Sequence, residues 1–138
     1  MAMSDKQAAK VTAFVQPSLG PGETIVAVLG QGMKGPSAMS ALISPFLAFL
    51  QKPLAVVVTD RRVILVKLKM AMTGYPPQAV AAEVGRNVVK ATFDRGTLSG
   101  KLTLTGVESS PTTLSIQTVF RDDAEKVAAV LAGNGGAA

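Results

Sequence analysis

The chain has 138 residues, which is enough for one domain to bury a hydrophobic core without disulfides or a metal. It contains no His and no Cys, and this excludes a Ser-His-Asp triad, a cysteine nucleophile and a zinc site built from imidazole or thiolate groups. The absence of Cys also matches a reducing compartment, and residues 1–10 are polar with no apolar signal segment after them. We therefore expect a non-enzymatic, cytoplasmic protein that carries no metal and no cofactor.

The charge balance is basic, with fourteen Lys and Arg against nine Asp and Glu and a net charge of +5. A basic balance can attract nucleic acid or an anionic membrane surface. The chain has one Tyr, five Phe and no Trp, so it offers few platforms on which bases could stack. We expect no nucleic-acid partner, and an anionic membrane surface stays open as an alternative.

The first elements in chain order are a helix and a strand. Residues 4–15 place apolar side chains on one helical stripe, and a Pro- and Gly-rich stretch ends the helix. This stripe consists of Ala8, Val11, Phe14 and Val15. Residues 23–29 are apolar and β-branched, which predicts a strand. Gly30, Gly32 and Gly35 then predict a flexible turn.

Residues 35–51 carry no charge, and their apolar side chains recur at helical spacing. The apolar face consists of Met39, Leu42, Ile43, Phe46, Phe49 and Leu50. A bilayer-spanning helix needs about 20 apolar residues, and this stretch is shorter and interrupted by Pro45. We therefore expect a helical insertion that covers the domain's own sheet or docks on an identical subunit, and these two alternatives stay level. Insertion into a membrane interface ranks lower, because the polar face lacks Lys and Arg.

Residues 54–59 and 62–70 are rich in Val, Ile and Leu, and the polar pair between them predicts a tight β-hairpin turn. In the second arm one face carries Ile64, Val66 and Leu68, and the other carries Val63, Leu65, Lys67 and Lys69. Residues 79–84 remain open between a short helix and a strand. Three further strands are predicted at residues 87–94, 101–105 and 112–120. The chain closes with a helix that begins near Arg121 and stops at Gly133, with a buried stripe of Ala124, Val127, Ala128 and Leu131.

The hairpin sequence Val-Val-Val-Thr-Asp-Arg-Arg-Val-Ile-Leu-Val, residues 56–66, resembles the hairpin of bacterial pleckstrin-homology-like (PH-like) domains. The order of strands and the single C-terminal helix extend the resemblance over residues 23–132. It implies a mainly β fold, a bent seven-stranded sandwich or partly open barrel with one end plugged by the last helix. The chain departs from that pattern in an N-terminal helical extension, residues 1–22, and in the helical insertion, residues 36–51. Residues 133–138 are predicted to form a flexible tail.

PH domains that bind phosphoinositides usually present basic residues around the loop between the first two strands. In this chain that connection holds only Lys34 and Lys52, so the resemblance does not predict headgroup binding by that route. An anion could instead contact Arg61, Arg62, Lys67 and Lys69. The favoured interpretation of the Thr59-Asp60-Arg61-Arg62 stretch is a turn stabilised by its own side chains.

The sequence favours a binding or scaffolding module that self-associates or binds a protein partner through the apolar segment and an exposed sheet edge. A peripheral membrane or lipid-binding module is the alternative. A carboxylate-dependent enzyme that uses Glu83 or Asp94 is a third hypothesis with little weight, because isolated acids at strand ends are ordinary surface residues.

Overall fold

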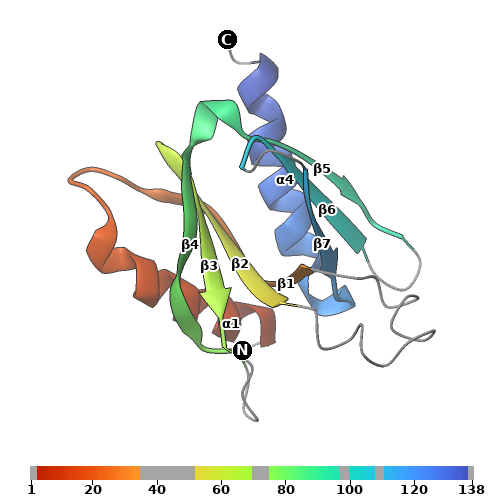
Figure 1. The fold of residues 1–138 in the computed structure, drawn as a ribbon, viewed down its shortest axis with the longest axis horizontal. Helices are drawn as coiled ribbons and strands as arrows, with labels where there is room; N and C mark the ends of the chain where they lie inside the picture. The colour runs from red at the N-terminus through yellow and green to blue at the C-terminus, as the bar shows by residue number, and fades with distance from the viewer. Residues whose placement is uncertain (1–2, 35–51, 70–74, 97–99, 108–110, 137–138) are drawn as a thin grey trace.

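One antiparallel sheet of seven strands organises the protein (Figure 1). The computed structural model describes residues 3–34, 52–69, 75–96, 100–107 and 111–136. The sheet order is β4-β3-β2-β1-β7-β6-β5, and the helices α1 and α4 stand at the two ends of the chain. The bounds of these elements are α1 Met3–Val15, β1 Ile25–Lys34, β2 Lys52–Thr59, β3 Arg62–Leu68, β4 Pro77–Gly85, β5 Lys90–Asp94, β6 Gly100–Thr105, β7 Thr112–Ile116 and α4 Arg121–Gly136.

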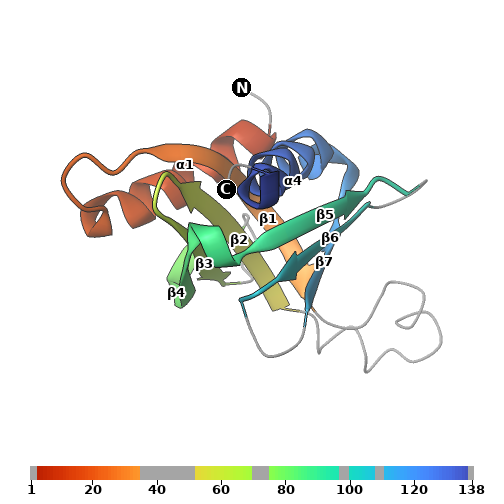
Figure 2. The same cartoon turned by 90° about the horizontal axis from the view of Figure 1, so that it is seen from above.

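Strand β1 joins the two halves of the sheet. It pairs with β2 from Ile25 to Lys34, and its last residues, Met33 and Lys34, also pair with β7. Two irregularities in the β1–β2 register interrupt the ladder, and such bulges increase local twist and bend a strand. The sheet therefore folds over on itself, as the view from above shows (Figure 2).

The sheet is open. Strands β4 and β5 are its two edges and are not neighbours in the hydrogen-bonded order. The barrel that the sequence resemblance allowed is therefore not closed in the part of the chain that the structure describes. The prediction of a mainly β fold with seven strands and a C-terminal helix is confirmed.

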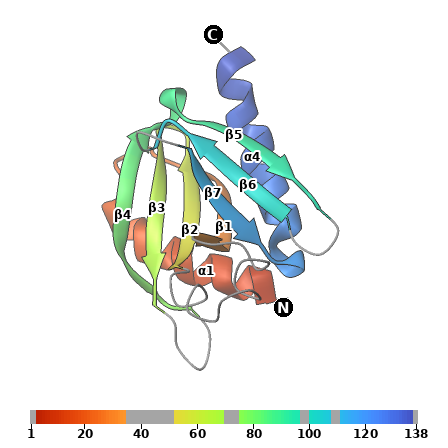
Figure 3. The same cartoon turned by 45° about the vertical axis from the view of Figure 1, so that its right-hand side comes forward.

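The two helices belong to separate buried clusters on opposite faces of β2 and β3. Figure 3 shows α1 beside β2 and β3, and α4 beside β5 and β6. Helix α1 packs mainly on β1, and its residues Val11 and Val15 join the buried cluster on one face of β2 and β3 that includes Val57 and Ile64. Helix α4 buries its own apolar stripe on the other face: Ala124, Val127, Ala128 and Leu131. Because both faces of β2 and β3 are covered, these strands are apolar almost throughout instead of alternating with polar residues.

Gly30 and Gly32, which follow the first predicted strand, do not form a turn. Strand β1 continues through Gly30 and Gly32 to Lys34. A Cβ added at Gly30 would lie 2.9 Å from Cγ of Gln7 and 3.0 Å from the backbone nitrogen of Ala8. The predicted turn at this position is therefore wrong, because the missing side chain at Gly30 serves the close approach of α1.

Several predicted boundaries also need correction. In α1 the buried stripe is Gln7, Val11 and Val15, whereas Phe14 is 37% exposed. The strand predicted at 112–120 ends at Ile116, because a 3-10 turn at Thr118–Phe120 already leads into α4. Helix α4 continues past Gly133 to Gly136. Residues 79–84 belong to strand β4, since they pair with β3.

The apolar segment 35–51 and all six of its candidate interaction residues lie outside the described residues. None of the helices in the described ranges combines the length and apolar character required to cross a bilayer.

Candidate functional site

The turn between β2 and β3 is held by its own side chains. The Thr59 hydroxyl oxygen accepts hydrogen bonds from the backbone N–H groups of Arg61 at 3.1 Å and Arg62 at 2.9 Å. A carboxylate oxygen of Asp60 accepts a hydrogen bond from the N–H of Thr24 at 3.1 Å. The side chains of Thr59 and Asp60 therefore supply acceptors for the backbone N–H groups at this turn.

Arg62 lies at the centre of an internal ion-pair network. Its Nε is 2.9 Å from Oε2 of Glu23, its Nη1 is 3.0 Å from Oε1 of Glu83, and its Nη2 donates to the carbonyl of Ser18 at 2.8 Å. The Glu23 side chain is only 3% exposed. The hydrogen bond from Arg62 is the largest of the effects that lower the pKa of Glu23 to about 2, and hydrogen bonds from Gly20 and Thr59 act in the same direction.

This network decides which arginine groups of the turn already have partners. All three guanidinium nitrogens of Arg62 have partners within the domain, so this side chain links the segment before β1 to the hairpin. Arg61 is exposed and donates to the carbonyl of Pro21 at 3.0 Å. Glu83 belongs to the same network in β4, whereas Asp94 lies in β5 and accepts a hydrogen bond from the N–H of Gly96 at 3.1 Å. The two acids therefore lie on opposite edges of the sheet.

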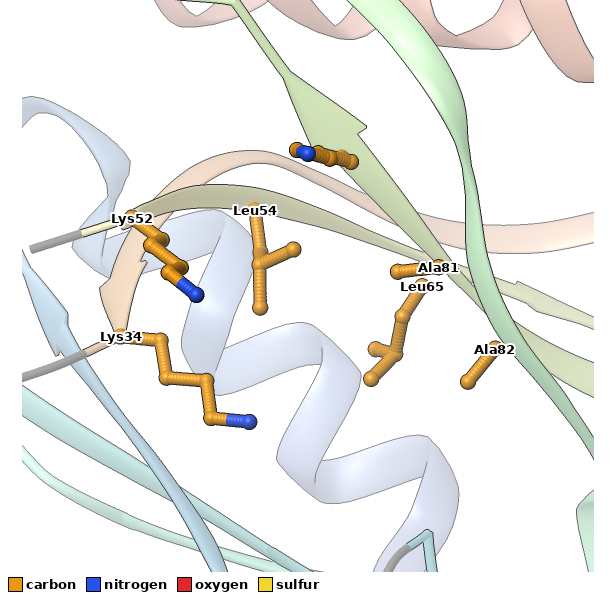
Figure 4. A pocket seen from close by; sticks show the side chains of 7 residues that line it. Lys34, Lys52, Leu54, Leu65, Ala81 and Ala82 are labelled. Carbon is orange, nitrogen blue, oxygen red and sulfur yellow. The ribbon is translucent and has the colours of Figure 1, made fainter.

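Three lysines from three strands line one cavity of about 200 Å³. Figure 4 shows two of them, Lys34 and Lys52, together with the apolar lining. We call this cavity the lysine pocket, and it is lined by Lys34, Lys52, Leu54, Leu65, Lys67, Ala81 and Ala82. Leu54 and Leu65 are buried and belong to the same apolar cluster as the inner side of α4. The pocket therefore combines a cationic rim with an apolar floor on the α4 face of the sheet.

Strand register explains why the lysines converge. Lys34 at the end of β1 is the direct partner of Lys52 at the start of β2, and Leu54 is the partner of Lys67 in β3. Alternation along each strand then puts Lys52 with Leu54, and Leu65 with Lys67, on one face. Figure 4 shows the side chains of Lys34 and Lys52 running alongside each other, with Leu65, Ala81 and Ala82 on the other side of Leu54.

A bulge in β4 completes the floor. Leu65 pairs with Ala82 and the next residue, Val66, pairs with Val80, so Ala81 is an extra residue in the edge strand. Two consecutive residues, Ala81 and Ala82, consequently line the same pocket. Both are alanines, whose small side chains leave the space above Leu54 and Leu65 unfilled.

The electrostatics of the pocket favour an anion. Like charges placed opposite one another on neighbouring strands repel, and Lys34 and Lys52 are such a pair. The described lining contributes three ammonium groups and no carboxylate. An anionic ligand group would thus be attracted by all three cations at once.

The sequence predictions and this site overlap only in part. Lys67 was predicted as an anion contact and lines the pocket, whereas its neighbour Lys69 does not. The sequence does not predict that Lys34 and Lys52 bind a phosphoinositide headgroup, and it does not predict their grouping with Lys67. The spacing of Lys52 and Leu54 predicts that they share one face of a strand. The register between strands cannot be predicted from the sequence. Within the described ranges no group of three acidic side chains is placed to hold a metal ion.

No protein-family model matches the chain, and no curated protein is similar to it. Among solved structures the chain is similar to a pleckstrin homology domain from Shewanella amazonensis SB2B, with 18% identity, a TM-score of 0.47, and coverage of 91% of this chain and 97% of that one. It is also similar to the hSac2 domain from the human phosphoinositide phosphatase Sac2, with 8% identity, a TM-score of 0.53, and coverage of 99% of this chain and 85% of that one. The likeness to the hSac2 domain is one of fold alone.

Proposed function

We propose that this chain is a non-enzymatic binding module that docks on an anionic membrane surface through the lysine pocket. The observation that carries the proposal is the convergence of Lys34, Lys52 and Lys67, from three strands, around one cavity. Each cation close to an anionic bilayer contributes about 1 kcal/mol to binding. Three such cations would therefore strengthen partitioning by about a hundredfold over a neutral surface.

The position of the uncharged segment supports the same function. Lys34 and Lys52 are the residues that immediately precede and follow residues 35–51, and they are direct strand partners. The segment therefore leaves and re-enters the sheet beside the cationic rim. The six residues of its predicted apolar face can enter the headgroup region while the lysines bind lipid phosphates. They are Met39, Leu42, Ile43, Phe46, Phe49 and Leu50. The charge that its own polar face lacks is supplied by the sheet.

A flotation experiment tests the proposal. Purified protein is mixed with vesicles that contain either neutral lipid alone or neutral lipid with anionic lipid, at low salt and at about 1 M salt, where the Debye length is about 3 Å. We expect flotation with anionic vesicles at low salt and its loss at high salt. Equal flotation with neutral vesicles, or none with anionic vesicles, would reject docking by the lysine pocket.

Self-association is the second candidate function, and the edge strand β4 favours it. Its residues Ala79 and Val80 are exposed, and Val80 is 41% exposed. The only charged residue of β4, Glu83, forms an ion pair with Arg62, so β4 has little charge that would oppose pairing with another strand. We propose that a second copy pairs with this edge, with Met39–Leu50 adding apolar contact. Light scattering over a range of concentrations checks this, and a monomer at every concentration would refute it.

A further inference from the structure

Beyond attracting negative charge, the lysine pocket has an apolar floor that a purely polar ligand would leave unused. Leu54 and Leu65 are 7% and 3% exposed, so the floor is part of the hydrophobic core. The bulge at Ala81 turns two small side chains toward the same space. A leucine or valine at either position would occupy part of the cavity. The composition of β4 therefore keeps open a space that has room for an aliphatic group.

The described lining of the pocket contains one kind of polar side chain. It offers the three lysine ammonium groups and no hydroxyl, amide or carboxylate side chain. A sugar-like headgroup would bring several hydroxyls against Leu54, Leu65 and the alanines, where they would lose their water partners without gaining new ones. A ligand with one compact anionic group and an aliphatic stem would satisfy both the rim and the floor.

The size of the cavity limits the length of that stem. A dry cavity of about 150 Å³ is known to hold one benzene molecule, which has six carbon atoms. The lysine pocket measures about 200 Å³. It can therefore hold a little more than about six carbon atoms, and a longer chain would extend out of the mouth.

We propose that the lysine pocket binds an anionic amphiphile, with the negative group between Lys34, Lys52 and Lys67 and the first carbons of an aliphatic chain on Leu54, Leu65 and Ala82. This inference rests on the proposed function and specifies its ligand. The same chemistry is present in a free fatty acid and in an anionic lipid of a bilayer, and the experiment below separates these two sources.

Titration of the wild-type protein with short carboxylates, followed by methyl NMR, is the first arm. Octanoate is expected to shift the methyl resonances of Leu54, Leu65 and Ala82 in a saturable manner. From butanoate upward, affinity should rise about fourfold for each added CH₂ group and level off once the floor is filled, after about six carbons. Octyl glucoside, which is neutral, and acetate, which has no chain, should each bind at least tenfold more weakly. Affinity that does not depend on chain length, or equal binding of octyl glucoside, would overturn the proposal.

The second arm uses Ala82→Leu, which fills the floor and leaves all three lysines in place. Octanoate affinity should fall at least tenfold, and Val80→Leu, on the same strand but outside the lining, serves as the control. If Ala82→Leu also weakens flotation with anionic vesicles, the ligand is a bilayer lipid; if flotation is unchanged, it is a free amphiphile. If the wild-type protein floats with anionic vesicles but octanoate does not shift its methyl resonances, the proposed amphiphile binding is wrong and the proposed membrane docking still holds. Wild-type protein that fails to float but binds octanoate would instead remove membrane docking alone.

Discussion

The Nε atom of Arg62 lies 2.9 Å from Oε2 of Glu23, and this contact joins the segment before β1 to the hairpin between β2 and β3. Because the carboxylate is 3% exposed and also accepts hydrogen bonds from Gly20 and Thr59, it has few alternative partners in water. Thr59 and Arg62, in the stretch of residues 59–62, therefore stabilise the turn and its surroundings, and the lysines proposed to bind a ligand lie at the lysine pocket.

The first prediction concerns this contact. Arg62→Ala should lower the melting temperature by on the order of 5 °C or more, since it leaves the Glu23 carboxylate without its strongest donor. Arg61→Ala, which removes an exposed side chain with one hydrogen bond to a carbonyl, is the matched control and should have a much smaller effect. Circular dichroism melts measure both. Equal destabilisation by the two variants would contradict the role given to Arg62.

The second prediction concerns acid stability. The pKa of Glu23 is lowered from 4.5 to about 2, so its ionised form is stabilised by folding. This contribution is fully present above the unfolded pKa and is lost as the pH falls from about 4.5 toward 2. Glu23→Gln removes it at every pH. The difference in melting temperature between wild type and Glu23→Gln should therefore be largest near pH 6 and shrink below pH 4.5. A difference that stays constant with pH would show that the carboxylate charge is not what stabilises the fold.

The third prediction concerns the packing of α1 on β1. Gly30→Ala would place a Cβ 2.9 Å from Cγ of Gln7 and 3.0 Å from the backbone nitrogen of Ala8. The helix must then move, and we expect a loss of about 1–3 kcal/mol in the free energy of unfolding. Gly85→Ala, whose Cβ would meet only the Asn87 side chain at 3.2 Å, is the control. Chemical denaturation measures both variants, and an unchanged midpoint for Gly30→Ala would contradict the close approach.

These glycines show where sequence reasoning reached its limit. The strands around the hairpin were predicted correctly because their apolar runs and polar break are local signals. Gly30 and Gly32 gave the local signal of a turn, yet tertiary packing decides their role, since each lets a neighbouring element approach β1. The extent of α4 was also predicted incorrectly, because Gly133 does not end the helix.

The candidate site was less predictable than the fold. Lys67 could be selected as part of the basic group at residues 61–69, but its association with Lys34 and Lys52 depends on the β1–β2 and β2–β3 registers. The bulge at Ala81 likewise depends on how β4 pairs with β3. Such cross-strand relationships join residues that are distant in the chain, and no local pattern records them.

The fourth prediction tests the central claim, namely that the three lysines of the pocket bind an anionic surface. Flotation with anionic vesicles is compared for Lys34→Ala, Lys52→Ala and Lys67→Ala, with Lys69→Ala and Lys90→Ala as controls that carry the same loss of charge outside the pocket.

Each pocket variant should reduce the partition coefficient by about fivefold, as expected for about 1 kcal/mol per cation, while both controls remain close to wild type. If all five variants weaken binding equally, net charge alone explains the attraction and the lysine pocket is not the binding site.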